Sequence, residues 1–299
     1  MGGGLKAVFQ IETAIAAGSA GSTFGGRPTF VGLAGNFGTV TLGRQDSPLL
    51  KASTPQLAGG SNNVVGQIMW SNFLASPDAD LTEATANLGL GRINQDVTID
   101  RAINYITPNF GGLTAELQVG QSDVELSGTG LTTETNKTDD AGVNIKYAVG
   151  ALTVNAANHT RKITATLAST SARKNVNNYV GATYDFGMAK VSLQHGTSKS
   201  DVTSTTAESY NNKGTQLGVQ VPVTTAINVF GSVGTGTRTI LTDAEFKQTS
   251  LQMGATYSLS KRTRLYTVYG QQELKGDNTI TAGDKLKESQ FALGVIHTF

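Results

Sequence analysis

Hydrophobic and polar residues alternate over long stretches of this chain. In VNIKYAV, the apolar Val143, Ile145 and Tyr147 alternate with the polar Asn144 and Lys146. The same period of two runs through LTAELQV, MAKVSLQHG, QLGVQV and LQMGATYSL. Successive side chains of a β-strand point to opposite faces of the sheet, so this pattern predicts strands with one apolar and one polar face.

The alternation predicts fourteen strands. They are expected at residues 5–12, 27–35, 38–45, 98–107, 113–121, 141–149, 151–159, 176–185, 188–197, 214–222, 226–235, 248–258, 262–273 and 288–299. Strands in the second half run for about ten residues, which is enough for a tilted strand to cross a bilayer. Strands of soluble domains are usually about five or six residues long. The length therefore favours a membrane-spanning sheet.

Short and long connections alternate between these strands. The short ones are expected at residues 35–39, 108–112, 148–151, 185–188, 222–225 and 258–261. The long ones, rich in Ser, Thr, Asn, Asp, Gly and Lys, are expected at roughly 13–26, 47–96, 122–140, 160–175, 197–213, 235–248 and 274–287. This order predicts an antiparallel sheet with tight turns at one edge and long loops at the other.

Alternation alone also fits a soluble two-sheet sandwich, in which the two apolar faces cover each other. Aromatic residues at the strand ends favour a transmembrane barrel instead. Phe37, Phe110 and Phe186 each come directly before the glycine of a short turn, where a membrane boundary would lie, and Tyr257 lies near another short connection. The last strand ends the chain with an alternating set on one face: Phe291, Leu293, Val295, His297 and Phe299.

Composition narrows the function classes further. The formal net charge of the 299 residues is +1, which gives no strong attraction for nucleic acid. Cysteine is absent, so disulfides, thiolate nucleophiles and zinc–cysteine sites are excluded. His159, His195 and His297 have no spacing typical of a metal site or a catalytic triad. We therefore expect no metal, no cofactor and no nucleic-acid partner.

Several segments together resemble a Gram-negative general porin of the β-proteobacterial type. They are GGGLKAVFQIE, FVGLAGNFGTVTLGRQ, INYITPNFGGLTAELQVG, GVNIKYAVGALTV, GATYDFGMAKVSL, LGVQVPVT, MGATYSLSKRTRLYTVYG and the terminal ALGVIHTF. The resemblance implies an all-β transmembrane antiparallel barrel of the sixteen-stranded porin type, a homotrimer in the outer membrane in contact with lipid and lipopolysaccharide. It implies passive diffusion of small hydrophilic solutes and ions, with a preference for anions. It also implies that His297 and Phe299 belong to the signal that the barrel-assembly machinery binds.

The resemblance extends to the start of the chain. GGGLKAVF has the form of FGGLTAEL and FGMAKVSL, which follow or include short turns. Fourteen strands and a start within a turn lead us to expect that two strands of a sixteen-stranded barrel precede this sequence. A native fourteen-stranded barrel is the alternative. If two strands are missing, the strands at 5–12 and 288–299 would have unpaired edges, which lipid cannot satisfy.

The pore itself is expected where the longest loop meets the polar face of the barrel. Porins fold the corresponding loop into the barrel, so residues 47–96 are predicted to narrow the channel, with Met69, Trp70 and Phe73 as apolar anchors. The alternative is a loop packed over the barrel mouth. The acidic residues expected on or beside this loop are Asp46, Asp78, Asp80 and Glu83. The residues expected to line the wall or the end of the loop are Lys6, Glu12, Arg27, Arg44, Arg92, Arg101, Glu116 and Lys146.

The alternation of side chains along a strand supports an inward, pore-lining orientation for some of these residues but not for all. Lys6, Glu12, Glu116 and Lys146 alternate with apolar neighbours and should point inward. Arg44 shares its parity with Val40 and Leu42, so a bulge at Gly43 would be needed to turn it inward. Opposed charges across a narrow water-filled gap would give the channel a charge preference.

Two other function classes remain open at this stage. An outer-membrane barrel enzyme would need a histidine with carboxylate or serine partners at one rim, and none of the three histidines has such neighbours in sequence. A soluble β-sandwich binding module would purify without detergent as a monodisperse species.

Replacement of Arg27 and Arg101 by alanine is expected to shift the reversal potential of the channel toward cations, because two wall cations would be lost. The measurement is a planar-bilayer recording under a salt gradient. A reversal potential equal to that of the parent would show that neither arginine contributes to the charge preference of the pore.

Overall fold

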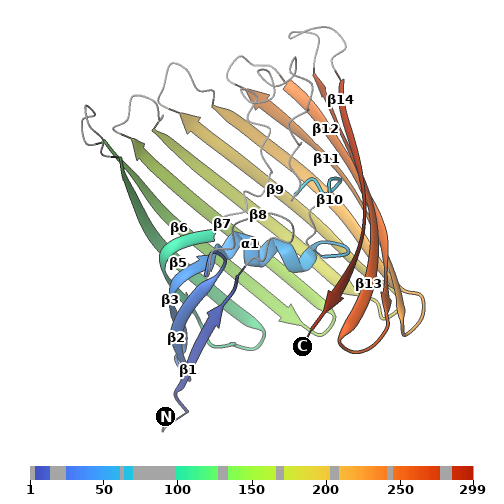
Figure 1. Ribbon diagram of the computed structural model, residues 1–299, viewed down its shortest axis with the longest axis horizontal. Helices are drawn as coiled ribbons and strands as arrows, with labels where there is room; N and C mark the ends of the chain where they lie inside the picture. The colour runs from blue at the N-terminus through green and yellow to red at the C-terminus, as the bar shows by residue number, and fades with distance from the viewer. Residues whose placement is uncertain are drawn as a thin grey trace.

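The computed structural model describes residues 4–13, 25–60, 64–69, 98–126, 134–165, 172–202, 209–240, 245–276 and 285–298. These residues form one antiparallel sheet of fourteen strands, in which every strand pairs with its neighbours in sequence. The sheet is strongly curved, and the short turns lie together at one of its edges (Figure 1). This confirms the predicted order of the strands and the position of the short turns.

The strands lie where the alternation predicts them. They are β1 (Lys6–Ile11), β2 (Thr29–Gly35), β3 (Gly38–Asp46), β4 (Thr98–Ile106), β5 (Leu113–Leu126), β6 (Glu134–Val149), β7 (Leu152–Ala165), β8 (Arg173–Asp185), β9 (Lys190–Val202), β10 (Tyr210–Pro222), β11 (Ile227–Ile240), β12 (Glu245–Ser258), β13 (Thr263–Gly276) and β14 (Lys285–His297). From β5 onward, the strands continue further toward the long connections than predicted. These extensions are largely polar, so the periodicity does not reveal them although the backbone pairing continues.

The segment after β3 contains the helical residues of the described chain. Helix α1 (Pro48–Ser53) is followed by a 3₁₀ turn, η1 (Thr54–Gln56). Ser47 caps α1, because its hydroxyl accepts a hydrogen bond from the Leu50 amide at 3.2 Å, and Pro48 occupies the first turn. Within the described ranges, no helix has both the length and the apolar character needed to cross a membrane.

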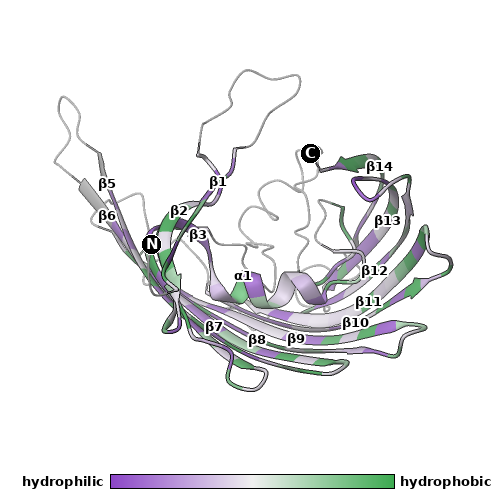
Figure 2. Cartoon of the chain, turned by 90° about the horizontal axis from the view of Figure 1, so that it is seen from below, coloured by the Kyte–Doolittle hydropathy of each residue, from purple (hydrophilic) through white to green (hydrophobic). Residues whose placement is uncertain are grey.

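The two faces of the sheet differ sharply in polarity. On the convex outer face the apolar side chains are exposed: Phe9 is 76% exposed, Leu193 53% and Phe291 65%. On the concave inner face the side chains are polar, and Gln194, for example, is fully buried although it follows Leu193 directly. Figure 2 shows α1 on this inner side, within the curve of the strands. A soluble sandwich would cover the apolar face with a second sheet, whereas the described strands belong to a single sheet.

Aromatic residues lie at the turn edge of the outer face. Phe37, Phe110 and Phe186 are all exposed beside short turns, and the ring of Phe186 lies 4.6 Å from that of Tyr184 between centroids. Tyr257, near another short connection, is also exposed. This placement is the one predicted for an interfacial girdle.

The sheet does not close on itself within the described residues. β1 pairs with β2 alone and β14 with β13 alone, so these two strands form its edges (Figure 2).

Ile145→Arg is expected to destabilise the protein in a bilayer by about 2–4 kcal/mol, because Ile145 lies on the outer apolar face of β6. The matched control is Lys146→Arg, which puts the same side chain on the inner face one residue further along. Urea unfolding from lipid vesicles measures both. Equal losses for the two variants would contradict the assignment of the faces.

Candidate functional site

Part of the longest loop lies against the inner face of the sheet. We call residues 47–60 and 64–69 the inner-face segment. Its helix α1 packs on β5, β6, β7 and β8, and η1 packs on β8 and β9. Further along, Gln252 of β12 donates hydrogen bonds to the carbonyl oxygens of Val64 (3.1 Å) and Val65 (3.0 Å). The segment therefore crosses the inner wall from β5 toward β13.

Glycines on the inner face allow this close approach. A Cβ built on each would lie 2.9 Å from Pro48 for Gly142, 2.9 Å from Ala58 for Gly218, 2.7 Å from Ile68 for Gly234 and 1.7 Å from the Val65 oxygen for Gly270. At Gly270 the atom in the way is backbone, so a larger residue would have to displace the segment. These glycines belong to β6, β10, β11 and β13, and together they follow the course of the segment.

Glutamine side chains provide most of the polar anchoring. Gln67 donates to the side-chain oxygen of Gln252 at 2.7 Å, and both residues are fully buried. Gln194 of β9 donates to the backbone oxygen of Gln56 at 2.6 Å. Since a buried polar group without a hydrogen-bond partner is costly, each of these bonds favours the observed position of the segment.

Two small apolar clusters add to this anchoring. Leu49 and Ala52 of α1 pack against Ala157 and Tyr179 on the inner wall. A second cluster contains Ala58 and Val64 of the segment with Phe230 and Val268 of the wall. Met69, one of the predicted anchors, is also buried, against Leu57 and Ile68 of the segment itself. Trp70 and Phe73 lie outside the described residues.

A charged pair joins the segment to the wall. Lys51 of α1 donates to Glu116 of β5 at 2.6 Å, and Glu116 is buried. The sequence analysis identified Glu116 but missed Lys51, because a lone lysine in a long polar loop has no distinguishing pattern. Here the loop supplies the cation and the wall the anion, the reverse of the expected polarity. The acidic loop residues of that expectation are Asp78, Asp80 and Glu83, and the cation expected at the end of the loop is Arg92. All four lie outside the described residues.

A second charged group lies nearby on β6 and β7. His159 Nε2 lies 2.9 Å from Asp140 Oδ1, and Arg161 donates to both oxygens of Asp140 at 2.8 and 3.0 Å. Asp140 is buried, and Arg161 of the neighbouring strand pairs with its carboxylate.

The other predicted wall residues lie at different positions along the strands, some near the short turns and some at the opposite ends. Lys6 and Lys146 are exposed on inner-face positions near the short turns. Arg27 and Glu12 form an ion pair with each other at the opposite end of β1. Asp46 accepts a hydrogen bond from the Thr98 hydroxyl at 3.2 Å.

Arg44 and Arg101 lie at an irregularity between β3 and β4. Gly43 pairs with Ala102 and Gln45 with Ile99, so the two residues of β4 between those partners face Arg44 alone. The extra residue is thus in β4, not at Gly43 as expected. Arg44 keeps the outward parity of Leu42 and pairs with Asp100, so the pleat does not support it as a pore-lining residue. Arg101 has a positive φ of 49° and donates to the backbone oxygen of Asp123 at 3.4 Å.

The C-terminal residues proposed as an assembly signal are only partly described. His297 is exposed, and its Nδ1 lies 2.9 Å from the Thr263 hydroxyl on β13. Phe299 lies outside the described residues.

Sequence comparisons agree with this architecture. The family model described as Gram-negative porin matches residues 1–277. Outer membrane porin protein 32 of Delftia acidovorans is 29% identical over 275 residues, covering 89% of this chain and 69% of that protein. Major outer membrane protein P.IA of Neisseria meningitidis serogroup C is 30% identical over 119 residues, which are 40% of this chain and 25% of that protein.

Solved structures give the same result. An anion-selective porin from Comamonas acidovorans superimposes with a TM-score of 0.71 at 25% identity, covering 100% of this chain and 86% of that chain. OmpT of Vibrio cholerae, expressed in the outer membrane, superimposes with a TM-score of 0.69 at 14% identity, covering 99% and 86%, and supports the fold alone. With a family match over most of its length and the same fold, the chain belongs to the Gram-negative porin family of outer-membrane proteins.

Proposed function

We propose that the protein forms a water-filled channel through the outer membrane for passive diffusion of small hydrophilic solutes and ions. The observation that carries this proposal is the division of the sheet into an exposed apolar outer face and a polar inner face. A curved sheet with these faces can contact lipid on one side and water on the other. Lipid and lipopolysaccharide would then contact the outer face.

We further propose that the inner-face segment narrows this channel. The segment runs across the concave side of the sheet, and the wall holds it through glutamine hydrogen bonds, the Lys51–Glu116 pair and two apolar clusters. Anchors spread over many strands would keep its position while solutes pass. The predicted loop 47–96 would be this constriction.

The channel is proposed to favour anions. Lys6, Lys146 and Lys190 occupy inner-face positions near the short turns, and within the described ranges none of them forms an ion pair. By contrast, Glu116 is paired with Lys51 and Asp140 with Arg161. The paired charges largely cancel, so the unpaired lysines dominate the field at that end of the channel. The Comamonas relative is described as anion-selective, which supports the same preference.

Assembly as a homotrimer is part of the proposal. OmpT of Vibrio cholerae is described in a trimer form, and it shares the fold of this chain. Recognition of His297 and Phe299 by the barrel-assembly machinery stays a prediction.

We propose no enzymatic activity. His159 does have a carboxylate neighbour in space, but it is fully buried and Arg161 shares that carboxylate. His195 and His297 lie on the outer face and contact the hydroxyls of Thr215 and Thr263. His159 therefore lacks the accessible ring that a general base needs.

Gly270→Ala is expected to displace the inner-face segment at a cost of about 1–3 kcal/mol, because the new Cβ would meet the Val65 carbonyl. Single-channel conductance should rise, and trypsin should cleave faster after Lys51. The matched control is Gly231→Ala on the outer side of β11, where the nearest atom is 3.7 Å away. A parent-like conductance and cleavage rate for Gly270→Ala would contradict the proposed constriction.

Replacement of both Lys6 and Lys146 by methionine is expected to shift the zero-current potential in a KCl gradient toward that of a cation-preferring channel. Methionine keeps much of the side-chain length but removes the charge. Lys213→Met removes one charge from the outer side of β10 and should leave this potential unchanged. If the double variant behaves like Lys213→Met, the lysines do not set the selectivity.

A further inference from the structure

A row of lysines crosses the sheet at the ends of the strands opposite the short turns. Lys213 of β10, Lys247 of β12 and Lys275 of β13 are all exposed. In the strand register, Lys213 pairs with Thr237 of β11, and Thr237 pairs with Lys247. Lys247 in turn pairs with Lys275, and Lys275 pairs with Lys285 of β14. We call Lys213, Thr237, Lys247 and Lys275 the lysine row.

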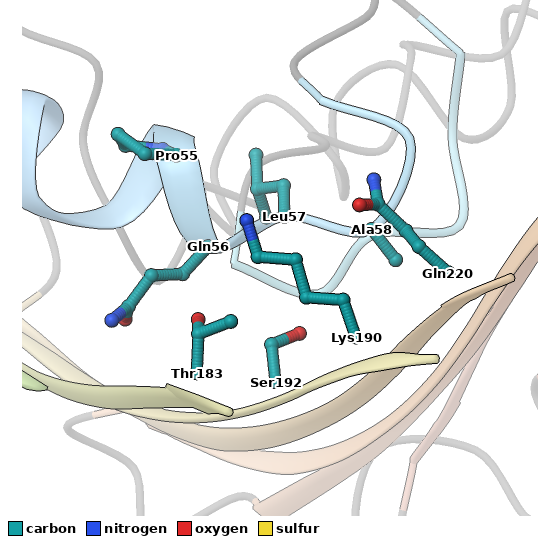
Figure 3. Close-up of a pocket in the computed structure, with 8 residues that line it drawn as sticks. All are labelled: Pro55, Gln56, Leu57, Ala58, Thr183, Lys190, Ser192 and Gln220. Carbon is teal, nitrogen blue, oxygen red and sulfur yellow. The ribbon is translucent and has the colours of Figure 1, made fainter. Parts of the chain in front are cut away.

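The lysine row belongs to the outer face of the sheet. Lys213 has the parity of Leu217, and Lys247 has the parity of Met253, and both of these apolar residues are exposed. Four residues separate Lys213 from Leu217, which is about 13 Å along a strand. Lys190 of β9 has the opposite parity, and its side chain extends toward the inner-face segment (Figure 3). The sheet therefore separates the lysine row from the lysines of the proposed channel.

Threonines lie between the lysine row and the apolar part of the outer face. Thr215, Thr235 and Thr249 pair with one another across β10, β11 and β12, two residues closer to the short turns than the row. The next outer positions of β11 and β12 are Val233 and Leu251. Toward the short turns this face thus presents ammonium groups, then hydroxyls, then apolar side chains. A lipid with an anionic, hydroxyl-rich headgroup above acyl chains has the complementary order.

Like charges lie directly opposite each other within the row. Lys247 and Lys275 are cross-strand partners, so their Cβ atoms are about 5 Å apart, and like charges in this arrangement destabilise a sheet. Within the described ranges, neither lysine forms an ion pair, and the same holds for Lys213. This includes Glu245 and Glu273, which lie two residues away from the row along β12 and β13. An anion bound between the ammonium groups would remove the repulsion.

The outer face of β6 to β9 has a different charge pattern. There the cross-strand order contains two acids and two lysines, namely Asp139, Lys162, Lys174 and Asp201. Asp139 also pairs with Lys137 at 3.5 Å. The lysine row contains no acid, so the excess of positive charge is a local feature of β10 to β13.

We propose that the lysine row binds phosphate groups of lipopolysaccharide, with the threonines contacting its sugars and the apolar residues its acyl chains. Outer-membrane barrels carry their long loops on the extracellular side, so this end of the strands lies in the leaflet that contains lipopolysaccharide. A phosphate between Lys247 and Lys275 accepts hydrogen bonds from both ammonium groups. Lys213 lies two strands from Lys247, about 10 Å away, which suits a headgroup with phosphates at both ends of a disaccharide. The proposal rests on the proposed contact of the outer face with lipid.

Titration of the detergent-purified chain with lipopolysaccharide tests the proposal, with thermophoresis of the labelled protein as the readout. The row variant combines Lys213→Gln, Lys247→Gln and Lys275→Gln, and its affinity is expected to fall by about tenfold or more. The control variant combines Lys137→Gln, Lys162→Gln and Lys174→Gln. It loses the same charge from the same face and should bind nearly as well as the parent. Unchanged affinity of the row variant, or equal losses in the two variants, would overturn the proposal.

Two further ligands identify the chemistry that is bound. Dephosphorylated lipopolysaccharide should bind the parent as weakly as intact lipopolysaccharide binds the row variant. If it binds the parent like the intact form, phosphate is not recognised and the proposal fails. Phosphatidylglycerol, a lipid with a single phosphate, should bind more weakly than lipopolysaccharide. Equal affinity for both lipids would show a general site for anionic lipid and overturn the choice of lipopolysaccharide.

The repulsion within the row also predicts an effect on stability. In phosphatidylcholine vesicles without lipopolysaccharide, the row variant should unfold at a higher urea concentration than the parent, because the opposed charges are gone. An equal or lower midpoint would contradict the inferred need for an anionic ligand. Conductance in a phospholipid bilayer without lipopolysaccharide tests the proposed channel separately. The row variant should conduct like the parent there, so a failure of lipid binding is distinguishable from a failure of the channel.

Discussion

Lipid offers no partners for backbone N–H and C=O groups, and this constraint organises the whole chain. Each strand from β2 to β13 pairs with its two neighbours in sequence, so the ladder satisfies the backbone along both edges of every inner strand. Once the backbone is paired in this way, the pleat assigns alternate side chains to opposite faces. Leu193 and Gln194 are adjacent in sequence, yet one faces outward and the other is buried beneath the inner-face segment.

The interior of the protein is consequently polar. Gln194, Gln216 and Gln252 are fully buried at positions that apolar residues would occupy in a soluble domain. An amide can both donate and accept, so it can bind backbone carbonyls of a crossing segment as well as other side chains. Gln252 does both, since it donates to Val64 and Val65 and accepts from Gln67. A wall of this kind holds a loop in a defined position while the surrounding space stays hydrophilic.

Charges inside the sheet fall into two groups. Under the inner-face segment they are paired, as in Lys51–Glu116 and Arg161–Asp140, because a buried charge without a partner is costly. Near the short turns, Lys6, Lys146 and Lys190 remain exposed to the interior. Of the two pairs, Lys51–Glu116 joins the loop to the wall and Arg161–Asp140 joins two wall strands, while the exposed lysines carry the proposed selectivity.

Much of the fold could be predicted from local pattern, because strand formation, face polarity and turn position all depend on neighbouring residues. The period of two placed all fourteen strands, and it oriented Glu116 and Lys146 inward correctly. The period of two did not reveal the strand extensions, since residues such as Lys137 and Asp139 put polar side chains where the pattern expects apolar ones. In the sequence, nothing distinguishes Gly142, Gly218, Gly234 and Gly270 from other strand residues. In the structure, the inner-face segment passes so close to them that a Cβ would not fit.

The sequence by itself determined the sheet, its order and its two faces, since alternation acts between residues that are close along the chain. Only the tertiary structure decided the partners of charged and polar groups. Lys51 meets Glu116 across 65 positions, and Gln67 meets Gln252 across 185, because the curvature of the sheet returns the loop to distant strands. The extra residue likewise lies in β4 and not in β3, so Arg44 keeps the outward parity of Leu42, and only the pairing of the two strands shows this. Contacts between residues so far apart have no periodic signal, and folding alone brings them together.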